Sequence, residues 1–334
     1  MSAATAILAA ARSPAAALLR LRRGASAAAP IRVPGLRAGG PGYRRITMAA
    51  AAQVGALAPA PADPLPKGAD SFFRTVTSNM EKVYLSRNPT AKNILELVRS
   101  YDGDHICYDH LAFRTFGVNG YGINSLAEFF TDFGYLPREE LRFPAKKLRA
   151  IWFSPPTNDG YTGTGIYGPL PRIFISELLV DELTAQSQFC FFILLTSVLS
   201  SLLFLDTRES EYAAWTLVNG YALNHATIST HRLESDIRSI DKFNKFVEDN
   251  GFKLNSEGGI LKVADSSLFT FADGITETIP RSYIEFAERL LLPQFKDLQD
   301  EEVKEHHRRD GFEVGNADKI FESTSKDQLT RRSA

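Results

Sequence analysis

The chain has 334 residues, of which 44% are hydrophobic and 23% are charged, and its formal net charge at pH 7 is −1. This is the composition of an ordinary globular protein, which excludes a disordered chain, a collagen and a coiled coil. The two cysteines, Cys107 and Cys190, are too few for a disulfide framework or a cysteine zinc site. The balanced charge gives no reason to expect nucleic-acid binding.

The amino end differs from the rest of the chain in its charge. Eight arginines and no acidic residue precede residue 46, in an alanine-rich segment, and without these arginines the net charge is −9 rather than −1. This composition is typical of an organelle transit peptide, with a disordered tail as the alternative. Residues 46–50 look like a plastid processing site. We therefore predict a transit peptide over 1–48 that directs the chain to the plastid (chloroplast or amyloplast stroma), with the mitochondrion as second choice. The Ala- and Pro-rich residues 49–66 are predicted to be a linker.

The hydrophobic periodicity then predicts one order of elements twice. Two helices, over 69–86 and 90–100, come first and are expected to form an N-terminal cap. The first repeat is predicted as a strand, a helix and three strands, over 109–116, 123–133, 135–143, 148–154 and 172–180. The second repeat is predicted in the same order, over 222–229, 235–250, 259–263, 267–271 and 281–287. A repeat of this size usually means two modules that share one core.

The predicted fold class is therefore α+β, with paired βαβββ modules and an N-terminal helical cap. The duplicated, metal-dependent catalytic domain is expected to span residues 68–293. Residues 294–334 are strongly charged and have no apolar period, so we expect a mobile or peripheral tail. The Gly-rich loop at 161–169 lacks the lysine and the strand-to-helix context of a phosphate-binding loop.

Residues 189–205 do not fit this pattern, because they are 17 consecutive uncharged and largely apolar residues. That length is at the lower limit for a membrane-spanning helix, and the flanks show no positive bias, so a membrane anchor is the less favoured interpretation. A buried helix between the modules is another. We favour a third, in which the segment is not native domain sequence but comes from a translated intron or a spliced variant.

Two histidines occupy matching positions in the repeats. His110 and His225 each lie on the first strand of a repeat, so both imidazoles face one cavity if the modules pair about a pseudo-twofold axis. Taken singly, each could be an ordinary polar strand residue. Glu285, on the last strand of the second repeat, adds a carboxylate, with a plain ion pair as its alternative role. Two imidazoles and one carboxylate form the triad that suits Fe(II) and leaves positions open for a chelating substrate and dioxygen. Glu177, on the last strand of the first repeat, is a weaker candidate for a fourth ligand.

Arg114 follows His110 by four residues on the same strand face, so the two Cα atoms lie about 13 Å apart. A guanidinium there can hold a carboxylate by a bidentate pair at a fixed distance from the metal. This geometry suits a small dicarboxylic acid whose other end chelates the metal, while a surface arginine is the alternative. Cys107 lacks an activating neighbour, and His306 and His307 lie in the charged tail and are expected to be solvated.

Three motifs together resemble one known family. They are His-Leu-Ala-Phe-Arg at 110–114, Asn-His-Ala-Thr at 224–227 and Tyr-Ile-Glu-Phe-Ala-Glu-Arg at 283–289. The chain resembles the 2-oxoadipate dioxygenase/decarboxylase family, also called the hydroxyglutarate synthase family, and is most similar to its plant plastid members. The resemblance covers residues 68–334 apart from the segment 189–205, where family members carry a longer and more polar connection.

The resemblance implies a fold related to the vicinal-oxygen-chelate superfamily. It implies Fe(II) held by His110, His225 and Glu285, and a substrate carboxylate bound by Arg114. These four residues are then the catalytic set, with His110 also beside the substrate. The implied reaction converts 2-oxoadipate and O2 to 2-hydroxyglutarate and CO2, a late step of lysine breakdown. Another metal-dependent enzyme on the same architecture and a non-catalytic plastid protein are the alternatives, and the oligomeric state is not predicted.

Overall fold

The structure is a computed structural model that describes residues 67–118, 120–156, 163–185, 187–188, 211–254, 262–270, 276–315 and 317. All of these belong to one unit, Met48–Ala334. The predicted transit peptide, the linker up to residue 66 and the apolar segment 189–205 lie outside the described residues. Among the residues that are described, no helix combines the length and the apolar character needed to cross a bilayer.

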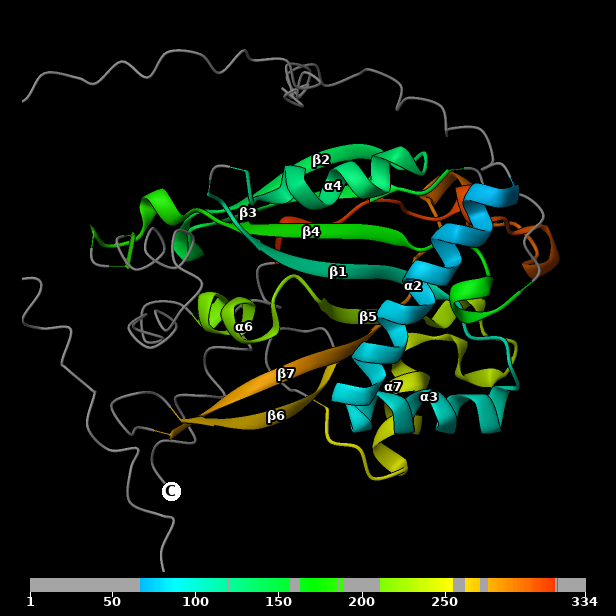
Figure 1. Ribbon diagram of the computed structural model, residues 1–334. Helices are drawn as coiled ribbons and strands as arrows, with labels where there is room; N and C mark the ends of the chain where they lie inside the picture. The colour runs from blue at the N-terminus through cyan, green and yellow to red at the C-terminus, as the bar shows by residue number, and fades with distance from the viewer. Residues whose placement is uncertain are drawn as a thin grey trace, which may run out of the picture. The chain divides into compact units, whose positions relative to one another are not determined.

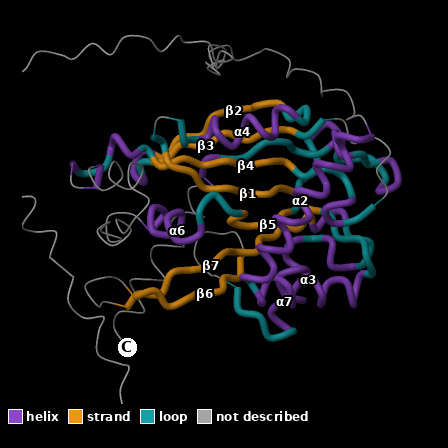
Figure 2. Tube along the Cα trace, viewed as in Figure 1, coloured by secondary structure: helices purple, strands orange, loops and turns teal. Residues whose placement is uncertain are grey.

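Seven strands form one mixed sheet in the order β2-β3-β4-β1-β5-β7-β6 (Figures 1 and 2). The first repeat supplies β1 (Tyr108–Phe116), β2 (Leu136–Phe143), β3 (Leu148–Ser154) and β4 (Arg172–Leu178). The second supplies β5 (Leu223–Ser229), β6 (Lys262–Thr270) and β7 (Thr276–Ala287). Strands β1 and β5 are antiparallel neighbours at the centre, and each is flanked by the parallel last strand of its own module. The two modules are therefore related by a pseudo-twofold axis between β1 and β5, and the predicted α+β fold with paired modules is confirmed.

Four helices cover one face of the sheet (Figure 1). They are α2 (Lys67–Arg87), α3 (Pro89–Asp102), α4 (Ile123–Asp132) and α7 (Ile240–Asp249), while α6 (Glu211–Asn219) contacts β1 and β7. The larger core lies between the four helices and the sheet and includes Phe73, Leu95, Phe130, Phe243, Leu111, Ile175, Ala226 and Ile284. Full burial of a large apolar side chain stabilises a fold by about 1.5–3 kcal/mol, so this layer fixes the sheet whose other face carries the site. Helices α2 and α3 form the predicted N-terminal cap.

Equivalent carboxylates start the helix of each module. Glu177, near the end of β4, accepts a hydrogen bond from the backbone N–H of Ile123 at 2.7 Å, at the first residue of α4. Glu288, just after β7, accepts one from the N–H of Ile240 at 2.8 Å, at the first residue of α7. A negative charge is favourable at a helix amino end because the first N–H groups lack partners within the helix. Both glutamates therefore have a structural role.

The second module differs from its prediction in two places. The described parts of the strands expected at 259–263 and 267–271 belong to one strand, β6, which continues through a register shift between Asp265 and Ser266. Residues 259–261 and 271 lie outside the described residues. A bulge absorbs an extra residue without ending a strand, so the two predicted strands are continuous here. The helix expected from residue 235 begins at Ile240, after a short 3-10 turn over Asp236–Arg238.

The end of the chain also differs from its prediction. The expectation of a mobile or peripheral tail over 294–334 does not hold for residues 305–313, part of which lines the sheet face opposite the four helices. Residues 294–304 are mostly exposed, and residues 316 and 318–334 lie outside the described residues. We call residues 305–313 the strap. Its charges are paired with the domain: Asp310 accepts a hydrogen bond from Arg172 at 2.6 Å. Phe312 packs on Trp152, with ring centroids 5.7 Å apart. Charged composition suggested a solvated tail because sequence alone cannot show that these charges have fixed partners.

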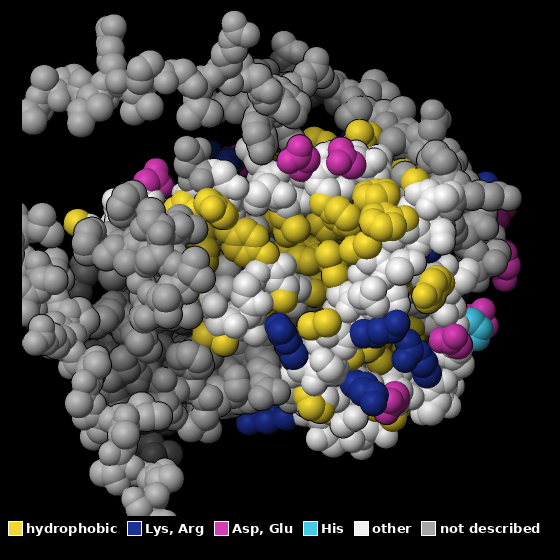
Figure 3. Space-filling view, in the orientation of Figure 1, with side chains coloured by type: hydrophobic (Ala, Val, Ile, Leu, Met, Phe, Trp, Pro, Cys, Tyr) yellow, Lys and Arg dark blue, Asp and Glu magenta, His cyan; other side chains and the backbone are white. Residues whose placement is uncertain are grey.

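Apolar side chains also gather on the helix-covered face of the molecule (Figure 3). Phe72 of α2 is 59% exposed and stacks on Phe133, with ring centroids 5.9 Å apart. This surface lies on the other side of the sheet from the cavity described next, so it takes no direct part in the site.

Candidate metal centre

The candidate site is a cavity of about 680 Å³ on the sheet face away from the four helices. It is lined by β1, β5, β7 and the strap. The four residues expected to carry the chemistry, His110, Arg114, His225 and Glu285, all line this cavity. The structure therefore brings together side chains that are up to 175 positions apart in the sequence.

Three of these side chains converge on one point. The Nε2 atom of His225 lies 3.3 Å from Nε2 of His110 and 3.4 Å from Oε2 of Glu285. Both histidines are 7% exposed and Glu285 is 1% exposed. Donor atoms this close can share one metal ion about 2 Å from each of them. Within the described part of the chain, this is the one group of three or more His, Cys, Asp and Glu side chains arranged to hold a metal.

The strand register explains why these residues meet. Thr227 of β5 pairs with His110 of β1 on one side and with Glu285 of β7 on the other. His225 lies two residues before Thr227, so its side chain points to the same face. The Oγ1 atom of Thr227 lies 3.1 Å from Nε2 of His110. His110 and Glu285 therefore lie at one level of the sheet, on either side of Thr227, and His225 lies two residues along β5 from that level.

A β-bulge turns two consecutive residues of each central strand toward the cavity. In β1, Tyr108 and Leu111 both belong to the helix-side core, and Asp109 and His110 between them line the cavity. The pairing of β1 with β5 shifts register between Tyr108 and His110. An extra residue at such a shift breaks the alternation of side chains along a strand. The same happens in β5, as residues 223 and 226 belong to the core and residues 224 and 225 line the cavity.

The bulges give each histidine a hydrogen-bond partner directly before it in the sequence. Oδ2 of Asp109 lies 2.9 Å from Nδ1 of His110, and Oδ1 of Asn224 lies 2.9 Å from Nδ1 of His225. Each oxygen can accept the Nδ1 proton, which leaves the lone pair of Nε2 directed at the meeting point of the donors. We missed both residues in the sequence, although Asp-His and Asn-His at matching repeat positions were a usable signal.

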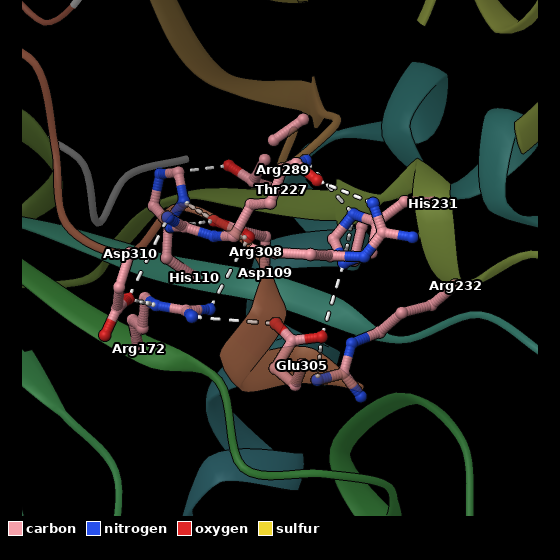
Figure 4. Close-up of polar contacts among 12 residues, drawn as sticks. Asp109, His110, Arg172, Thr227, His231, Arg232, Arg289, Glu305, Arg308 and Asp310 are labelled. Carbon is pink, nitrogen blue, oxygen red and sulfur yellow. Dashed lines mark hydrogen bonds and ion pairs between the residues drawn. The ribbon is translucent and has the colours of Figure 1, made fainter. Parts of the chain in front are cut away.

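Asp109 is held as a carboxylate by two arginines. Arg289 donates to both of its oxygens, from Nε at 2.5 Å and from a terminal nitrogen at 2.9 Å, and Arg172 lies 3.6 Å away. Burial alone would raise the pKa of Asp109, but Arg289 above all, with His110 and Arg172, holds that pKa well below its ordinary value. Figure 4 shows how these side chains meet around Asp109.

Arg114 is a buried residue of the cavity wall, which excludes the alternative of a surface arginine. The centre of its guanidinium lies 4.9 Å from the ring of Tyr212 and 5.3 Å from the ring of Trp215, both on α6. Stacking on aromatic faces holds the charge of an arginine in one orientation. The two aromatic residues were not predicted, because α6 follows the apolar segment and lies outside the two predicted repeats.

The strap forms the wall of the cavity beside His110. The ring of Phe312 meets the ring of His110 edge to face, with centroids 4.9 Å apart, and lies equally far from the ring of Phe174. This apolar contact restricts the access of water to the imidazole. Phe312 was missed because we expected the tail to be peripheral.

Glu177, the weaker candidate for a fourth ligand, does not lie at this site. Its second carboxylate oxygen accepts a hydrogen bond from Nε of Arg149 at 2.7 Å. The strand register identifies the counterpart of Glu285 in the first module. In the second module, His225 pairs with Tyr283, and Glu285 lies two residues after Tyr283. In the first module, His110 pairs with Arg172, and the residue two positions after Arg172 is Phe174. The pseudo-twofold axis therefore places an aromatic ring where a second carboxylate ligand could have been.

Two histidines and one carboxylate at the centre of a sheet built from two paired modules define a candidate mononuclear metal site. A family model described as 2-oxoadipate dioxygenase/decarboxylase matches residues 76–191 and 206–305. The chain therefore belongs to the 2-oxoadipate dioxygenase/decarboxylase family, as its motifs suggested.

Individual relatives agree with this membership. A protein of Oryza sativa subsp. japonica named 2-oxoadipate dioxygenase/decarboxylase, chloroplastic/amyloplastic, is 74% identical over 98% of this chain and 99% of its own length. An Arabidopsis thaliana protein with the chloroplastic form of that name is 57% identical over 79% of this chain and 80% of its own length. The crystal structure of the Oryza sativa hydroxyglutarate synthase in complex with 2-oxoadipate is 73% identical, with a TM-score of 0.76, and the match covers 84% of this chain and 100% of that one.

The family match is interrupted at the apolar segment. It stops at residue 191 and resumes at residue 206, so residues 192–205 are not matched by the family model. This agrees with the interpretation that the segment is not native domain sequence, and its origin stays a prediction.

Proposed function

We propose that this chain is an Fe(II)-dependent dioxygenase of the plastid that converts 2-oxoadipate and O2 to 2-hydroxyglutarate and CO2, a step of lysine breakdown. One observation carries the proposal: the donors of His110, His225 and Glu285 converge within 4.8 Å of one another in a cavity that a buried arginine, Arg114, also lines. The names of the rice and Arabidopsis relatives, and the 2-oxoadipate in the rice crystal structure, support the substrate and the compartment. We further propose that residues 1–48 are the transit peptide and that the catalytic domain begins at residue 68 and extends past the predicted boundary at 293 to include the strap, because Phe312 lines the cavity.

The donor set fits the proposed metal. Two neutral imidazoles and one carboxylate are the ligands of non-haem Fe(II) oxygenases and leave positions open for other ligands. The partners of Nδ1, Asp109 and Asn224, favour the tautomer that presents Nε2 to a metal. When bound, iron supplies the activation of dioxygen and the redox chemistry of the reaction.

The chain's own residues bind and orient the substrate. Arg114 pairs with the far carboxylate, and its distance from His110 along β1, about 13 Å between Cα atoms, selects the chain length that reaches both ends of the cavity. The 2-oxo acid end then lies beside the three donors, next to His110. Phe312 and Phe174 line this end with apolar rings, which exclude water from the reacting atoms.

The overall conversion balances with dioxygen as the one oxidant. The bond between the first carboxyl carbon and the keto carbon breaks, and the carboxyl carbon leaves as CO2. The keto carbon becomes the new carboxylate with one oxygen atom of O2, and the neighbouring carbon receives the other as a hydroxyl group. The far carboxylate of the substrate stays paired with Arg114, which keeps the shortened acid in the cavity until this hydroxylation is complete.

The direct test is oxygen consumption by the purified chain supplied with Fe(II) and 2-oxoadipate, with mass analysis of the products. We expect equal amounts of O2 consumed, CO2 released and 2-hydroxyglutarate formed. Turnover of catechols or of thiol adducts without any reaction of 2-oxoadipate would assign the chain to another activity of the same architecture. A matched His225→Ala variant should bind no iron and consume no O2. Full iron content and normal function of that variant would instead favour a non-catalytic role.

A further inference from the structure

Arg289 is the last residue of the third motif, 283–289, and the proposed reaction does not use it directly. It lies two residues after the end of β7 and four after Glu285, and it is 9% exposed. Buried arginines are costly unless their donors are paired, so the partners of this guanidinium indicate what it does.

One edge of the guanidinium is committed to Asp109, 180 residues earlier in the chain. The pair is bidentate, with Nε 2.5 Å from Oδ1 and a terminal nitrogen 2.9 Å from Oδ2 of Asp109. That same Oδ2 accepts the hydrogen bond from Nδ1 of His110 at 2.9 Å. The planar fork of an arginine fixes the plane of the carboxylate it holds, and this carboxylate in turn fixes the imidazole.

The other terminal nitrogen of the guanidinium is committed to the strap. It donates to the carbonyl oxygens of Arg309 at 3.2 Å and of Gly311 at 3.0 Å. The next strap residue, Phe312, lies with its ring 5.6 Å from the guanidinium carbon and packs edge to face on His110. Arg289 therefore acts on His110 by two routes, through Asp109 at Nδ1 and through the strap at the ring.

The second module lacks this arrangement. His225 has the neutral amide of Asn224 in the place of Asp109, and an amide cannot form a fork pair with an arginine. Nδ2 of Asn224 has no hydrogen-bond partner among the described side chains and backbone groups. Of two histidines related by pseudo-symmetry, one thus has an ionic support that reaches the strap and the other has a neutral support.

We infer that Arg289 is a positioning residue of the metal centre: it orients His110 through Asp109 and holds the strap against the same imidazole. This inference rests on the proposed function, because it takes His110 to be a metal ligand. Replacement of Arg289 should weaken metal binding as well as stability. A purely structural ion pair would affect stability alone.

The test is an anaerobic titration of the full-length chain with Fe(II), without substrate, in the wild type and in Arg289→Gln. Arg172, 3.6 Å from Asp109, remains in the variant and keeps a positive charge beside the buried carboxylate. Loss of a partner that supports a metal ligand typically weakens metal binding about 10–100-fold, and we expect an increase of the dissociation constant in that range. Arg289→Lys, which keeps the charge but not the fork, should restore part of the affinity.

Arg149→Gln is the matched control. Arg149 also pairs with two carboxylates, those of Glu177 at 2.7 Å and Glu140 at 3.2 Å, but these contacts lie outside the cavity. This variant should lose stability with no change in the Fe(II) dissociation constant. An equal loss of affinity in Arg149→Gln and Arg289→Gln would overturn the inference and leave Arg289 a general stabiliser.

A double-mutant cycle with Asp109→Asn separates the route through Asp109 from other effects. This change gives the first module the amide of the second, and Arg289→Gln should then cause little further loss of metal affinity. Fully additive losses of metal affinity would contradict an action of Arg289 through Asp109.

If Arg289→Gln does not fold, Arg289→Lys and Asp109→Asn decide the same question, and wild-type Fe(II) affinity in both variants would refute the inference. A wild-type chain that binds no Fe(II) would instead refute the proposed function.

Discussion

Replacement of Arg114 by methionine tests how the cavity recognises the second carboxylate of its substrate. The guanidinium is buried and is fixed against Tyr212 and Trp215, at 4.9 and 5.3 Å, so it needs little reorganisation to bind an anion. Methionine has a similar length and no charge, and it can occupy the same apolar surroundings. The variant therefore removes the anion-binding group while it keeps most of the packing.

The size of the effect follows from the two hydrogen bonds of a bidentate pair. A hydrogen bond to a charged group contributes about 1.5–3 kcal/mol, so the pair corresponds to about 3–6 kcal/mol. At about 1.4 kcal/mol for each tenfold change, kcat/KM for 2-oxoadipate should fall roughly 10²–10⁴-fold in Arg114→Met. Binding of Fe(II) should not change, because Arg114 is not among the three donors.

The assay compares two substrates in both proteins by initial rates of O2 consumption. 2-Oxohexanoate has the same carbon chain as 2-oxoadipate but no second carboxylate. The wild type should prefer the diacid by the factor given above, and Arg114→Met should lose that preference. A variant that folds, binds iron and still prefers the diacid as strongly as the wild type does would refute the role assigned to Arg114.

Three further predictions concern the metal and the strap. Fe(II) at 100 times its dissociation constant should stabilise the wild-type fold by about 2.7 kcal/mol, and His225→Ala should abolish this stabilisation. The shift of the unfolding temperature on adding iron measures the effect in both proteins. Asp109→Asn should make the free energy of unfolding less dependent on pH in acid. The pKa of Asp109 is lower in the folded chain than in the unfolded chain, so its carboxylate stabilises the fold fully above the unfolded pKa of about 3.9. This stabilisation is lost as the pH falls below that value toward the folded pKa. Unchanged acid sensitivity of the variant would contradict this. Phe312→Ala should lower kcat/KM and destabilise the chain by less than the about 3–5 kcal/mol typical of a fully buried phenylalanine, since its ring is only partly buried; urea unfolding and O2 consumption measure the two effects.

Strand alternation and the internal repeat were sufficient to predict that His110 and His225 lie close together. The period of two in 109–116 and 222–229 placed His110 and His225 on equivalent strands, and the two strands are indeed neighbours at the centre of the sheet. The same rule predicted Arg114 on the face of His110. These predictions succeeded because they depend on local periodicity and on the symmetry of a duplication.

The supports of the site could not be predicted in the same way. Alternation places Asp109 on the opposite face from His110, and only the bulge, which depends on pairing with β5, brings both to the cavity. Arg289 could be placed on the face of Glu285, but its partner is 180 residues away in the sequence. The strap was predicted to be peripheral because its charges, such as Asp310 with Arg172, find their partners only in the folded chain.

The central claim is that the chain incorporates dioxygen into a decarboxylated diacid at the site of His110, His225 and Glu285. Turnover of 2-oxoadipate under isotopically labelled dioxygen, with mass analysis of both products, tests this claim most directly. The account predicts 2-hydroxyglutarate that carries both heavy oxygen atoms and CO2 that carries neither, with no product from the His225→Ala variant. Unlabelled 2-hydroxyglutarate, or labelled product from that variant, would contradict it.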